Sequence, residues 1–84
     1  MGEPDLKRLD QMLRERGYLV ATSAIHGPTN GWYMIQATFQ SPMNNFYVTS
    51  AKWSSNVSDK DFAFGLEQAL KAQGIDPTKL KGEP

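Results

Sequence analysis

The sequence of 84 residues lacks cysteine, net charge and long apolar runs. Without cysteine the chain has no disulfide, which small secreted domains usually need, and no thiolate nucleophile. No run approaches the ~20 apolar residues of a membrane-spanning helix, and acidic residues precede any stretch that could act as a signal peptide. We therefore expect one soluble domain, 1–84, located in the cytoplasm and without a membrane partner.

The sequence is also poor in the residue sets that carry out catalysis. It contains a single histidine, His26, and no Asp or Glu from Gly17 to Ser58, so three or four metal ligands cannot be assembled there. A glycine-rich phosphate loop, paired catalytic carboxylates and a nucleophile elbow are missing as well. These absences predict that the protein is not an enzyme and uses no metal or cofactor.

Charge is absent from the middle of the chain. The 35 residues from Gly17 to Ala51 include no Asp, Glu, Lys or Arg, although they hold six of the nine aromatic residues. Lys52 is the single charged residue from Tyr18 to Ser58. Because nucleic-acid binding depends on neutralising phosphates, this charge distribution disfavours a nucleic-acid partner without excluding one.

Two helices are predicted at the ends of the chain. Leucines with helical spacing predict the first over about 4–16, with Asp10 and Arg14 placed to form an ion pair on its solvent side. Ser58, three residues before Asp61, has the spacing of a capping box and starts the second helix, over about 59–73. The remainder, 75–84, is predicted to be a flexible or short-turn tail.

Three strands are predicted between the helices, because side chains alternate over about 18–26, 32–40 and 46–53. Turns rich in Gly, Pro and Asn separate them at 27–31 and 41–45. The order predicts an α+β fold: a two-layer α-β-β-β-α arrangement, in which a three-stranded antiparallel meander has both helices on one face.

We expect the other face of the sheet to be open to solvent and to bind a partner. The pattern of the second strand places Ile35 and Phe39 under the helices and Trp32 on the open face. In the first strand we expect Leu19 to be covered, and in the third the alternation does not decide which set faces inward. The residues predicted to bind a partner are Tyr18, His26, Trp32, Met34, Gln36, Tyr47, Thr49, Lys52 and Trp53.

Several of these residues have a second interpretation. His26 is either a surface residue at a strand end or the general base of an RNase. Lys52 is either an anchor for phosphate or carboxylate or an edge-strand lysine that discourages aggregation. Phe64, opposite the apolar side of the second helix, is either exposed or covered by the tail; cover by Leu80 or Ile75 is the simpler expectation.

The predicted order of elements is similar to that of double-stranded-RNA-binding domains and of HicA-type RNA-cleaving toxins. The segments 13–18 (LRERGY) and 60–66 (KDFAFGL) resemble those toxins at the end of the first helix and in the second. A Gly-Ser-His-type motif supplies their catalytic histidine; here Ala24-Ile25-His26-Gly27 lacks the Gly-Ser pair. The resemblance implies RNA binding, or RNA cleavage by His26.

The residues themselves favour a different function. A neutral surface of aromatic, Met, Gln and Thr side chains is typical of a protein interface. We therefore expect a small protein-binding module or inhibitor that acts through the open sheet face or an edge strand. The alternatives are an RNA or single-stranded nucleic-acid binding module and a homodimer.

Overall fold

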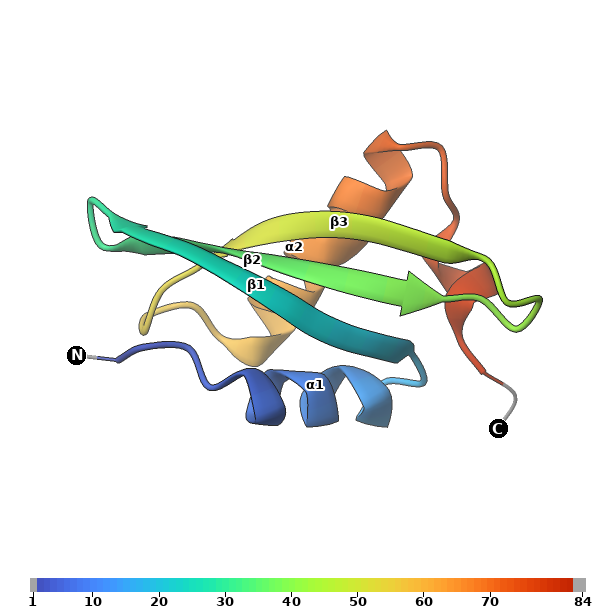
Figure 1. Ribbon diagram of the computed structural model, residues 1–84, viewed down its shortest axis with the longest axis horizontal. Coiled ribbons are helices and arrows are strands. Elements are labelled where there is room, and N and C mark those ends of the chain that lie inside the picture. Colours follow the sequence, from blue (N-terminus) through green and yellow to red (C-terminus); the bar gives the residue numbers. More distant parts are fainter. Residues whose placement is uncertain (1, 83–84) are drawn as a thin grey trace.

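The computed structural model describes residues 2–82 and contains a three-stranded sheet, two helices and a short 3-10 turn. Figure 1 shows these elements along the chain. Their bounds are α1 Leu6–Glu15, β1 Leu19–Thr29, β2 Trp32–Gln40, β3 Phe46–Trp53, α2 Asp59–Ala72 and the 3-10 turn Pro77–Leu80. No helix in this part of the chain has the length and apolarity needed to span a membrane.

The predicted fold class is confirmed. The sheet has the order β1-β2-β3 with both pairs antiparallel, and α1 and α2 contribute to one core against the same sheet face. In Figure 1 the strands lie in front of α2, while α1 runs alongside β1. Helices cover one face because Ile35, Ala37 and Phe39 of β2 point to that side, and all three are fully buried.

The helix ends follow from capping side chains. Ser58 Oγ accepts a hydrogen bond of 3.1 Å from the backbone N–H of Asp61, as the capping-box spacing predicted. At α1 the carboxylate of Asp5 accepts the N–H of Arg8, so the helix starts at Leu6 and not at residue 4.

The first hairpin is tighter than the sequence analysis predicted. β1 continues to Thr29, which pairs with Trp32, and only Asn30 and Gly31 form the turn. Both turn residues have positive φ, 52° and 83°, which is the conformation that an Asn-Gly pair adopts in a two-residue hairpin. The Asn-Gly dipeptide between two alternating segments was the signal that could have identified this turn.

The C-terminal segment returns to the start of the sheet. The 3-10 turn buries Leu80, and the N–H of Gly82 donates a 2.8 Å hydrogen bond to the carbonyl of Gly17. The tail was predicted as flexible or short-turn over 75–84; its residues 83 and 84 lie outside the described residues. Phe64 is 59% exposed, so the expected cover by Leu80 or Ile75 was wrong.

Candidate functional site

The open face of the sheet is defined by the pairing of β1 and β3 with β2. Side chains directly opposite each other in an antiparallel pair lie on the same face. Trp32 and every second residue after it point away from the helices, and the residues opposite them do the same. We call this set the open face: Leu19, Ala21, Ala24, His26, Thr29, Trp32, Met34, Gln36, Thr38, Gln40, Phe46, Val48, Ser50 and Lys52.

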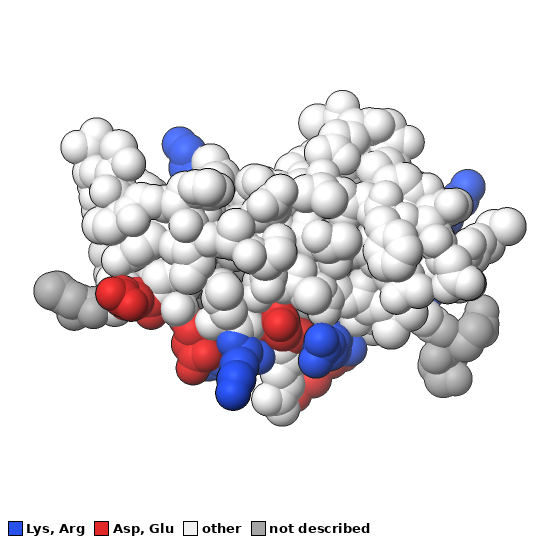
Figure 2. All heavy atoms as spheres, in the orientation of Figure 1, with Lys and Arg blue, Asp and Glu red and all other residues white. Residues whose placement is uncertain are grey.

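This face combines exposed apolar side chains with a near absence of charge. Five large apolar residues on it are 38–64% exposed: Leu19, Trp32, Met34, Phe46 and Val48. Among the residues of the open face, only Lys52 is a Lys, Arg, Asp or Glu. In Figure 2, which views the molecule from the same side as Figure 1, charged residues gather along α1 and the sheet is almost free of them.

Four of the predicted partner-binding residues lie on the covered face instead. Tyr18, Thr49 and Trp53 are only 2%, 4% and 6% exposed, and Tyr47 is partly buried against the same core. Phe46 stands opposite Gln40, so register places Phe46 on the open face and Tyr47 beneath the helices. The placement of these four residues on the open face was therefore wrong.

At the start of β1, too, the side chains that face the helices are the opposite set from the one predicted. Leu19 pairs with Gln40 on the open face, while Val20 pairs with Phe39 in the core, so the expected cover over Leu19 was wrong. An irregularity between Thr22 and Ala24 then shifts the alternation by one residue. After it His26 pairs with Met34 and so reaches the open face as predicted.

The open face thus keeps five of the predicted site residues and gains others. His26, Trp32, Met34, Gln36 and Lys52 lie together on it. Sequence reasoning missed three exposed apolar residues that extend it at the opposite end from Trp32: Leu19, Phe46 and Val48. The available signal was the turn at 41–45, because an assigned pairing of Gln40 with Phe46 sets the faces of all of β3.

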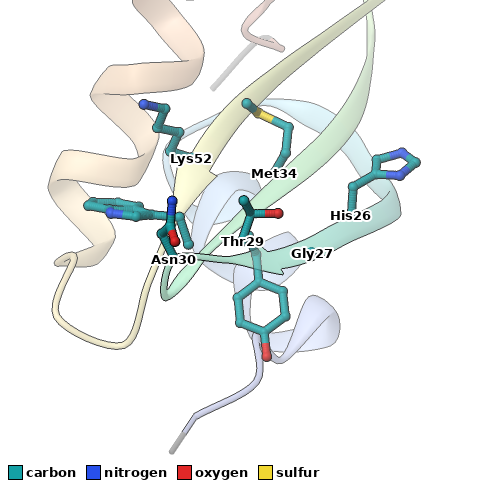
Figure 3. A pocket seen from close by; sticks show the side chains of 8 residues that line it. His26, Gly27, Thr29, Asn30, Met34 and Lys52 are labelled. Atoms are coloured by element: carbon teal, nitrogen blue, oxygen red, sulfur yellow. The ribbon is translucent and has the colours of Figure 1, made fainter.

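The end of the open face next to the Asn30-Gly31 turn is hollowed. His26, Met34 and Lys52 stand opposite one another across the three strands, and Figure 3 shows Met34 between the other two. Together with Trp32 they line a shallow hollow of about 360 Å³. The Lys52 Nζ atom lies 6.0 Å from the centroid of the Trp32 ring, a separation at the limit of a cation–π contact.

Side chains from the helices occupy part of both sheet edges. On β1, the backbone N–H of Thr22 donates a 2.7 Å hydrogen bond to Asp10 Oδ1, and the Thr22 hydroxyl donates to the same oxygen. Asp10 therefore binds Thr22, and the ion pair predicted with Arg14 does not form among the described residues. On β3, Gln73 Nε2 donates a 3.1 Å hydrogen bond to the carbonyl of Val48. Backbone groups that would pair with an added strand are thereby engaged at one point on each edge.

The described part of the chain contains no group of three or more His, Asp or Glu residues that could hold a metal ion. Comparison of the chain with known protein families, with curated proteins and with solved structures found no match.

Proposed function

We propose that this protein is a non-catalytic protein-binding module or inhibitor that contacts its partner through the open face. The observation that carries the proposal is the composition of that face. Five large apolar side chains are exposed on one side of a small sheet that has a single charged residue. Exposed large apolar side chains on one face of a small domain mark an interface more often than an inert surface, and depletion of charge is typical of interface cores.

The open face is a better candidate than the sheet edges. A partner that adds a strand needs free N–H and C=O groups along an edge strand. Asp10 engages such a group on β1 and Gln73 engages one on β3. Nothing comparable covers the open face among the described residues, and its side chains are the ones left to solvent.

A protein partner also fits the charges better than a nucleic acid does. Each phosphate contact normally takes a Lys or Arg, and the open face offers only Lys52. The bases of α1 lie among acids of the same helix, and Arg8 is already paired with Asp59 at 2.6 Å. A partner whose own surface is apolar and amide-rich requires no such phosphate contacts.

Two phenylalanines allow a matched test. Phe46 on the open face is 64% exposed and Phe64 on α2 is 59% exposed, so Phe46→Ser and Phe64→Ser make the same chemical change at similar exposure. Both variants should keep the stability of the native protein within about 0.5 kcal/mol. Immobilised native protein and Phe64→Ser should capture the same proteins from a lysate, and Phe46→Ser should lose them. Capture of the same proteins by all three would contradict the proposal.

Self-association is measured with the same variants. Sedimentation equilibrium of the native protein reports whether a second copy occupies the face. A dimer that Phe46→Ser dissociates and Phe64→Ser does not would identify that copy as the partner.

A further inference from the structure

Lys52 has no carboxylate partner among the described residues. Within residues 2–82 the one ion pair between side chains joins Arg8 to Asp59, on the helix side of the molecule. Lys52 is exposed on an edge strand, and its ammonium group lies near the Trp32 ring. A positive charge and an exposed aromatic surface are therefore presented at one place.

The neighbours of Lys52 form a site with two kinds of surface. Met34 lies next to Lys52 in the cross-strand row, and Trp32 is two residues from Met34 on the same strand and face. Met34 is 38% exposed and Trp32 is 43% exposed, and both line the hollow beside the hairpin turn. Among the residues that line the hollow, Trp32 and Met34 thus offer apolar surface and Lys52 offers a positive charge.

We propose, on the basis of the function proposed above, that the partner inserts an acidic side chain with an apolar neighbour into this hollow. The carboxylate of the partner's Asp or Glu binds the ammonium group of Lys52. The adjacent apolar or aromatic side chain packs on Trp32 and Met34. Burial of the apolar neighbour supplies affinity, while the charge pair selects the acidic sequence and its orientation.

Charge complementarity argues against a second copy as the occupant. No Asp or Glu belongs to the open face, so a copy that docks by the same face has no carboxylate for Lys52. A two-fold arrangement of two open faces would add a second unpaired lysine to the interface. A different protein with an acidic segment removes both difficulties.

The inference is tested with short peptides that differ in one carboxylate. The N-acetylated, C-amidated tripeptides Glu-Leu-Phe and Gln-Leu-Phe are titrated at millimolar concentration into the full chain, and backbone amide shifts are followed by NMR. The Glu peptide should shift the amides of Trp32, Met34 and Lys52 and bind about two- to fivefold more tightly than the Gln peptide, the range of an exposed ion pair. Lys52→Met should abolish this preference, whereas Lys60→Met, which removes an exposed lysine of α2, should preserve it.

Equal binding of the two peptides, a preference that survives Lys52→Met, or no shift at the hollow with either peptide would overturn the inference. A third peptide, Gln-Leu-Phe with a free C-terminal carboxylate, separates a side-chain acid from a chain end. Tighter binding of this peptide than of the Glu peptide would overturn the choice of a side-chain carboxylate. None of these results depends on Phe46, so the capture experiment still decides the proposed function by itself.

Discussion

The phenolic hydroxyl of Tyr18 donates a 2.5 Å hydrogen bond to Glu67 Oε2, which joins the start of the sheet to the middle of α2. The Tyr18 ring packs edge-on against Phe39, with ring centroids 5.3 Å apart. Burial, reinforced by the hydrogen bond to Glu67, raises the pKa of the Tyr18 phenol well above its ordinary value of 10.0. Tyr18, which the sequence suggested as a partner contact, is therefore a structural residue.

Replacing Tyr18 with Phe should destabilise the protein. The variant keeps the ring in the core but removes the donor to a carboxylate, which costs about 1 to 2 kcal/mol of unfolding free energy. Urea denaturation at neutral pH measures the change. Tyr33→Phe is the control, because the Tyr33 hydroxyl has no hydrogen-bond partner among the described residues; a loss of equal size in both variants would refute the role of Glu67.

Burial of the Tyr18 phenol, together with its hydrogen bond to Glu67, should make stability fall at alkaline pH. Since the pKa of Tyr18 is raised on folding, the unfolded chain releases the phenolic proton near pH 10 while the folded protein retains it. The stabilisation is complete below pH 10 and is lost as pH rises from there towards the folded-state pKa. The difference in unfolding free energy between native protein and Tyr18→Phe should therefore shrink above about pH 10; a difference independent of pH would be inconsistent with this linkage.

Removing the carboxylate of Asp10 should free the edge of β1. Asp10→Ala leaves the backbone N–H of Thr22 without its acceptor and leaves the Thr22 hydroxyl only the Leu6 carbonyl, 3.4 Å away, at a cost of about 1 to 3 kcal/mol. Hydrogen exchange at the Thr22 amide should accelerate more than the global loss of stability explains. Glu15→Ala, at an exposed position of the same helix, should change stability by less than about 0.5 kcal/mol.

Trp53 combines a buried ring with an N–H that has no acceptor among the described residues. Trp53→Phe removes this unsatisfied donor along with part of the ring volume, so the two effects oppose each other. Trp53→Ala removes the same donor but leaves a much larger cavity, and it should cost about 3 to 5 kcal/mol. Thermal unfolding should rank Trp53→Phe much closer to the native protein than to Trp53→Ala; a loss in Trp53→Phe close to that of Trp53→Ala would contradict the offset between the removed donor and the lost ring volume.

The predictions that were confirmed rest on sequence patterns that are consistent with only one local structure. β2 has all its large aliphatic and phenyl side chains in one alternating set, so the buried set of Ile35, Ala37 and Phe39 could be identified directly. Ser58 and Asp61 have a spacing that is meaningful only at a helix start.

The predictions that failed concern strands in which both sets are apolar. In β3 one alternating set contains Phe46 and Val48, and the other contains Tyr47 and Trp53. Local alternation is equally consistent with either set facing the core. An irregularity within β1 further breaks the two-residue period. These faces depend on pairing with β2, which is a long-range property.

By itself the sequence determined the order of the elements, the antiparallel meander with both helices on one face, and an uncharged centre, because these follow from local periodicity, caps and composition. Only the tertiary structure decided which side chains form the open face, since register joins residues that are distant in the chain. In the structure the open face contains Leu19, Phe46 and Val48, whereas the predicted Tyr18, Tyr47, Thr49 and Trp53 lie on the covered face. His26, Met34 and Lys52 lie in one cross-strand row beside Trp32.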